Sequence, residues 1–98
     1  MTRTAKRVFT DPGDIEHLRA QIHQLCEGAF VRLTMKDGTR QQGTVSDRPQ
    51  AQVFFNPDGE EGTNAVVRLE DPAMDPAGAT QREFWLDEIA RIERLDPP

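Results

Sequence analysis

The chain has 98 residues, of which 36% are hydrophobic and 30% are charged, and its formal net charge is −5. This size fits one small domain, and the composition excludes a disordered chain and a long apolar span across a membrane. Residues 1–48 carry eight Lys/Arg and six Asp/Glu, whereas residues 49–98 carry four Arg and eleven Asp/Glu. Because duplex DNA binders usually present a basic stripe, we expect no duplex DNA partner.

The cysteine content and the N-terminus bear on the compartment. Cys26 is the single cysteine, so it has no internal disulfide partner. The first residues are basic, but no apolar stretch follows them, and we therefore expect no secretory signal. Together these features predict a protein of the reducing cytoplasm.

The N-terminal part predicts an arm followed by one helix. Residues 1–10 are expected to form a flexible basic arm. Asp11 can cap free N–H groups and Pro12 is tolerated at a first helical position, so the helix is predicted over 11–27. Its apolar residues fall on a single stripe, and Gly28 is a natural stop. The stripe consists of Ile15, Leu18, Ile22, Leu25 and Cys26.

The segments that follow alternate between short strands and turns. A strand is predicted from residue 29 to 35, a hairpin turn at Asp37-Gly38, and a second strand over 39–47 in which Gly43 indicates a bulge or a sharp bend. Further strands are predicted within 51–55 and 65–70. The segment 56–64 is rich in turn-forming and acidic residues, and 71–80 is expected to be a long loop.

The last segment allows two interpretations. Residues 83–86 are typical of a strand. The apolar spacing of three from Leu86 to Leu95 also fits a short helix. We favour a strand, a tight turn at Asp87-Glu88 and a final strand, because the preceding strands need closing; the helical alternative stays open.

This pattern of a helix followed by bent strands resembles the Sm-like barrel of RNA-associated proteins. It is also similar to a small bacterial family for which an Sm-like motif has been proposed. The predicted fold is therefore α+β and mainly β: one domain over 11–98 with an N-terminal helix and a five- to six-stranded, strongly bent antiparallel Sm-like or SH3-like barrel. The residues that carry the resemblance are Val31, Leu33, Gly38, Gly43, Val45, Asp47, Ile89 and Ile92.

The resemblance implies binding of single-stranded RNA and homo-oligomers that form through exposed strand edges. Sm proteins hold a base with an Asn after the second strand and an Arg-Gly pair before the last one. Here the first position reads Asp47-Arg48-Pro49-Gln50-Ala51, without Asn, and Trp85-Leu86 stands in place of Arg-Gly.

The candidate binding surface for RNA or a protein partner comprises Phe30, Arg32, Arg48 and Trp85. Phe84 and Trp85 face opposite sides of a strand, so one of them can be exposed and stack on a base. The structural alternatives are that Trp85 covers the end of the barrel and that Phe30 packs against Ile22 or Cys26.

The sequence predicts no catalytic residues, no metal site and no cofactor. His17 and His23 are six residues apart on the helix and cannot share a metal. The acidic residues of 56–64 match no calcium loop. We therefore expect a non-catalytic binding module for single-stranded RNA, or alternatively a protein-interaction or regulatory protein with no nucleic-acid role.

Overall fold

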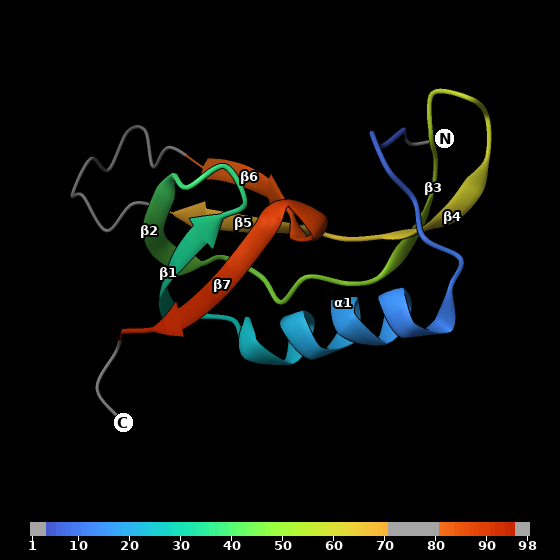
Figure 1. The fold of residues 1–98 in the computed structure, drawn as a ribbon. Coiled ribbons are helices and arrows are strands. Elements are labelled where there is room, and N and C mark those ends of the chain that lie inside the picture. The colour runs from blue at the N-terminus through green and yellow to red at the C-terminus, as the bar shows by residue number, and fades with distance from the viewer. Residues whose placement is uncertain (1–3, 71–80, 96–98) are drawn as a thin grey trace.

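The computed structural model describes residues 4–70 and 81–95. One helix is followed by seven strands and a single turn of 3-10 helix (Figure 1). The elements are α1 Pro12–Gln24, β1 Phe30–Met35, β2 Arg40–Val45, β3 Gln52–Phe55, β4 Glu61–Asn64, β5 Val66–Glu70, β6 Gln81–Trp85, the 3-10 turn Leu86–Glu88, and β7 Ile89–Arg94.

The strands form two antiparallel sheets. The larger sheet has the order β6-β5-β2-β1-β7, and β3 and β4 form a separate two-stranded hairpin. The inward residues of the larger sheet and the apolar stripe of α1 make up one core, and α1 lies along one side of the sheet (Figure 1). The expected mainly β, Sm-like architecture is confirmed. Among the described residues β6 and β7 do not pair, so the larger sheet stays open.

Helix α1 starts as the sequence predicts and ends earlier. The Asp11 carboxylate accepts hydrogen bonds from the N–H groups of Gly13 (3.0 Å) and Asp14 (3.2 Å). The expected end at residue 27 is wrong, because Leu25 already leaves helical geometry and the chain turns through Gly28, whose φ is +84°. This early exit directs the chain into β1.

The buried face of α1 carries one polar residue that the apolar pattern does not reveal. Gln21 is 6% exposed. Its side-chain amide donates to the carbonyls of Leu86 (3.0 Å) and Ile89 (3.4 Å). Gln21 thereby joins the helix to the turn between β6 and β7, where the Leu86 carbonyl also accepts from the Ile89 N–H.

The β1–β2 hairpin follows the sequence prediction, except at Gly43. Its turn contains Gly38 at a φ of +91°. The register between the two strands is regular across Gly43, so of the two predicted alternatives, a bulge or a sharp bend, the bulge is absent there. Instead β5 approaches closely: a Cβ on Gly43 would lie 2.8 Å from the Glu70 carbonyl oxygen. Glycine is needed at this position for contact between backbones.

The segment 56–64, expected to be a turn, contains β4, and this raises the strand count to seven. β4 pairs with β3. The N-terminal segment runs beside this hairpin (Figure 1). Ala5 N–H donates to the Phe55 carbonyl (2.9 Å), and Phe9 and Thr63 exchange two main-chain hydrogen bonds (2.9 and 2.8 Å). The described part of the expected flexible arm is therefore packed onto the hairpin, with Ala5 buried.

The final segment forms strand, turn and strand, as favoured, and the helical alternative is wrong. β6 ends at Trp85, a single 3-10 turn covers Leu86–Glu88, and β7 begins at Ile89. β7 pairs with β1, with a register shift between Thr34 and Met35. The expected loop 71–80 lies outside the described residues.

Candidate interaction groove

The predicted site residues come from three places: Phe30 and Arg32 from β1, Arg48 from the segment between β2 and β3, and Trp85 from the end of β6. In β1, Val31 and Leu33 are buried in the core, so Phe30 and Arg32 face outward on the other side. Ile22 and Cys26, the alternative partners of Phe30, pack against the core. The Arg32 guanidinium donates to the side-chain oxygen of Gln42 (3.4 Å) on β2. Phe30 and Arg32 line none of the hollows described below.

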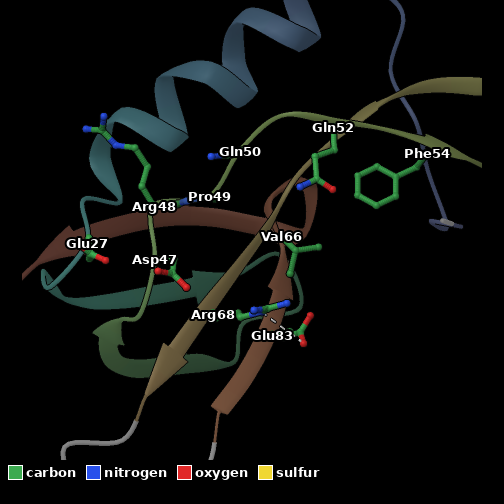
Figure 2. Close-up of a pocket in the computed structure, with 10 residues that line it drawn as sticks. All are labelled: Glu27, Asp47, Arg48, Pro49, Gln50, Gln52, Phe54, Val66, Arg68 and Glu83. Carbon is green, nitrogen blue, oxygen red and sulfur yellow. Dashed lines mark ion pairs between the residues drawn. The ribbon is translucent and has the colours of Figure 1, made fainter. Parts of the chain in front are cut away.

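A groove of about 420 Å³ lies between the segment that follows β2 and the strands β5 and β6 (Figure 2). We call it the bulge groove. Residues 47–50 and Gln52 form one wall, and the outward residues Val66, Arg68 and Glu83 of β5 and β6 form the other. Glu27 and Phe54 complete the lining and lie at opposite sides of the close-up.

The groove exists because the pairing between the chain that runs from β2 to β3 and the chain that runs from β4 to β5 is interrupted. Ser46 N–H donates to the Arg68 carbonyl (3.0 Å), and the next pair along is Gln52 with Asn64. Five residues, 47–51, thus lie opposite three residues, 65–67. The two extra residues form a bulge that moves one chain away from the other, with the ring of Pro49 buried in it.

The charges around the bulge groove are mixed. Arg68 and Glu83 form an ion pair at 3.7 Å across β5 and β6, and both side chains are about half exposed. Arg48 points toward α1, away from Arg68 (Figure 2), and its guanidinium lies 3.5 Å from the Cys26 sulfur. The groove therefore has no concentration of positive charge.

Trp85 lies beside the bulge groove in an edge-to-face contact. Its ring centroid is 5.1 Å from that of Phe54, with 77° between the ring planes. Phe54 is 2% exposed, so it is a packing partner for the indole. The two rings share a smaller hollow with Thr4 and Val66. The structure thus brings Trp85 near the groove that Arg48 lines, and it leaves Phe30 and Arg32 elsewhere on the sheet.

A second hollow of about 450 Å³ contains none of the predicted residues. It lies between the N-terminal segment, the β1–β2 turn and the 3-10 turn. Asp87 belongs to it and is nearly buried: its carboxylate accepts from the Asn64 amide (3.0 Å) and pairs with Arg7 (3.7 Å). These contacts join the N-terminal segment to the main fold, so the Asp87 carboxylate has a structural role.

Within 4–70 and 81–95, no group of three His, Cys, Asp or Glu residues is placed to hold a metal ion. No helix in the same ranges is long and apolar enough to cross a membrane.

Apart from Arg48, the residues that make the groove are not predicted from the sequence. Val66 and Arg68 are typical of any strand. The bulge arises because five residues separate Ser46 from Gln52, whereas three separate their partners Asn64 and Arg68. The one local signal is Pro49, which cannot donate to a strand ladder and interrupts a run of strand-forming residues. That signal indicates a break in the strand without showing the groove beside it.

The comparisons with known proteins agree with this architecture. The fold is that of Sm-like proteins: the chain is similar to the crystal structure of XC5848 from Xanthomonas campestris, described as a novel variant of the Sm-like motif. The TM-score is 0.86 and the identity 27%, over 98% of this chain and 100% of that chain.

A family model places the chain more narrowly. The model described as "Domain of unknown function (DUF3247)" matches residues 2–95. The chain therefore belongs to this family. A search of curated proteins finds no match to the chain.

Proposed function

We propose that this protein is a non-catalytic interaction module that assembles with other copies of itself through the two free edges of its larger sheet. The observation that carries this proposal is the strand order β6-β5-β2-β1-β7, in which β6 and β7 each have one neighbour among the described strands. An unpaired edge offers a row of N–H and C=O groups to another strand. The Sm-like fold supports the same role.

The hydrogen-bond alternation identifies the groups at the edge of β7. Leu95 N–H donates to the Phe30 carbonyl (2.8 Å), so Leu95, Glu93 and Arg91 direct their main chain toward β1. The N–H groups of Ile92 and Arg94 then point away from β1, to the outer side of β7. Arg94 is the better position for a test, because Ile92 packs against the core.

The test is the mass of the full chain in solution. The natural chain is expected at a multiple of the 11.1 kDa monomer mass by light scattering after gel filtration. Arg94→Pro removes an N–H that is directed away from β1 and breaks no hydrogen bond of the β1–β7 pairing, so it should shift the chain to the monomer. Arg94→Ala controls for the side chain and should keep the assembly. A natural chain that stays monomeric would disprove the proposal.

Single-stranded RNA is the second candidate ligand, and one observation favours it. On the outward face Arg40 and Arg91 flank Thr34 from the two neighbouring strands, with Arg32 two residues along β1. Arg40 is exposed and has no ion pair among the described residues. Glu93 lies on the same face opposite Arg32 and pairs with Arg91 at 3.9 Å, so three guanidiniums and one carboxylate leave a local positive surface in an acidic protein.

Anisotropy of labelled U-rich RNA would test this candidate at about 50 and 200 mM salt, because phosphate contacts weaken steeply over that range. Saturable, salt-sensitive binding that Arg40→Glu abolishes would establish RNA as a ligand. Arg19→Glu, an exposed substitution on α1, is the control for net charge. No binding at the lower salt would remove RNA from consideration.

A further inference from the structure

The main chain of β5 faces the bulge groove with hydrogen-bonding groups. Leu86 N–H donates to the Ala65 carbonyl (3.0 Å), so Ala65 and Val67 direct their main chain toward β6. Val66 and Arg68 therefore face the opposite side, where Ser46 N–H reaches the Arg68 carbonyl. After Ser46, residues 47–51 move away from β5. The N–H and C=O of Val66 and the N–H of Arg68 are the main-chain groups of β5 that face the groove.

These groups have the pattern that another strand residue satisfies. A donor and an acceptor on one residue, Val66, match the C=O and N–H of one residue on an incoming extended chain. The gap opposite residues 65–67 is about 10 Å long at 3.3 Å per residue. The side chains of Val66 and Phe54 offer an apolar contact beside this short edge.

The charges around the groove oppose a polyanion. Three carboxylates line it, those of Glu27, Asp47 and Glu83, against two guanidiniums. Of these guanidiniums, Arg68 is paired with Glu83, and Arg48 is directed toward Cys26. A phosphate backbone in the groove would therefore approach more carboxylates than available cations, whereas a polypeptide of mixed charge meets no such repulsion.

We propose that the bulge groove binds a short extended segment of a partner polypeptide, which pairs its main chain with Val66 and Arg68. The contact adds about three residues of strand to the inner edge of β5. Because so few hydrogen bonds form, the dissociation constant for an isolated short peptide is expected to be on the order of 1 mM. This inference does not depend on the assembly proposed above. The peptide would pair with the inner edge of β5, whereas the assembly uses the outer edges of β6 and β7.

Amide NMR on the full 15N-labelled chain tests the proposal directly. The probe is an equimolar library of acetylated, amidated tetrapeptides, and the matched control is the same library with its two central nitrogens methylated. The unmethylated library is expected to shift the amide resonances of Val66 and Arg68, and the methylated library to shift them several-fold less. No shift at these amides, or equal shifts with both libraries, would overturn the proposal.

Two tryptophan substitutions locate the binding. Gln50→Trp adds bulk at the groove and should abolish the shifts, whereas Gln42→Trp, on β2 outside the groove, should retain them. The spectra themselves report whether each variant is folded. Shifts that survive in Gln50→Trp would overturn the site, and U-rich RNA that moves the same amides would overturn the ligand class. Solution mass, measured in parallel, reports separately on assembly.

Discussion

Gly62 lies directly against Val8, so that a Cβ built on Gly62 would be 2.8 Å from the Cβ of Val8 and 2.9 Å from the carbonyl oxygen of Phe9. The N-terminal segment crosses the β3–β4 hairpin at this point. It is held on both sides of the crossing by the hydrogen bonds from Ala5 to Phe55 and between Phe9 and Thr63. The hairpin and the segment therefore depend on each other for their position.

Gly62→Ala should lower the free energy of unfolding by about 1–3 kcal/mol, because the added methyl group displaces the segment above it. Urea denaturation followed by circular dichroism measures the change. Val8→Gly in the Gly62→Ala background makes room on one side and should recover part of the loss relative to the sum of the two single changes. A Gly62→Ala chain as stable as the natural one would contradict the observed packing.

Gln21→Ala should lower the free energy of unfolding by about 1–3 kcal/mol, since it removes the buried side-chain amide that donates to the carbonyls of Leu86 and Ile89. Gln24→Ala, at an exposed position on the same helix, is the control and should change stability by less than about 0.5 kcal/mol. Equal effects of the two substitutions in urea denaturation would mean that the buried amide does not hold the turn.

Gln21→Glu should make stability depend on pH. The protonated acid can donate one hydrogen bond to the two carbonyls, whereas the carboxylate cannot donate, and burial raises the pKa of the new group. A group whose folded-state pKa is raised stabilises the protein at low pH and loses this contribution as pH rises through the folded pKa. The penalty relative to the natural chain should thus be larger at pH 7 than at pH 4. A pH-independent penalty would be evidence against burial.

Thr39→Val should raise the pKa of the Asp37 carboxyl group. The Thr39 hydroxyl (2.7 Å) and then the Thr39 N–H (2.9 Å) donate to this carboxylate and hold its pKa below the ordinary value. A lowered folded-state pKa contributes stability above the unfolded pKa, and this contribution is lost as pH falls through the folded pKa. Carboxyl 13C titration by NMR measures the shift, and Thr34→Val on the neighbouring strand should leave it unchanged.

Phe54→Ala should lower the free energy of unfolding by about 3–5 kcal/mol, the usual range for a buried phenylalanine. Trp85 is the single tryptophan of the chain, so the emission comes from this side chain alone, and Phe54 is its edge-to-face ring partner. Loss of that contact should move the emission maximum to longer wavelength. Phe55→Ala, at the half-buried neighbouring position, should move it less. An unchanged spectrum in the folded Phe54→Ala chain would contradict the edge-to-face packing.

Local signals in the sequence were enough for the helix start and the first hairpin. The hydrogen bonds that cap the helix at Asp11 and close the turn at Asp37-Gly38 join residues only two positions apart. These local structures therefore hardly depend on the rest of the chain. β4 could not be predicted in this way, because Gly62 and Asn64 have low strand propensity. Their extended conformation depends on partners in segments 4–9 and 52–55.

The groove was beyond prediction for a related reason. Of the expected site residues, Arg48 lines the bulge groove and Trp85 contacts Phe54 beside it, whereas Phe30 and Arg32 line neither hollow. Their grouping depends on the register between segments that are about twenty residues apart in sequence. A pattern of residue types fixes which face a side chain takes within one strand, but not how many residues a neighbouring strand leaves unpaired.

The bulge also affects how this part of the chain can change in length. The register before it is fixed by Ser46 with Arg68, and the register after it by Gln52 with Asn64. A residue inserted or deleted within 47–51 is absorbed between these two anchors and leaves the inward and outward faces of both strands as they are. Natural variation in length at this position would then widen or narrow the groove while the core stays intact.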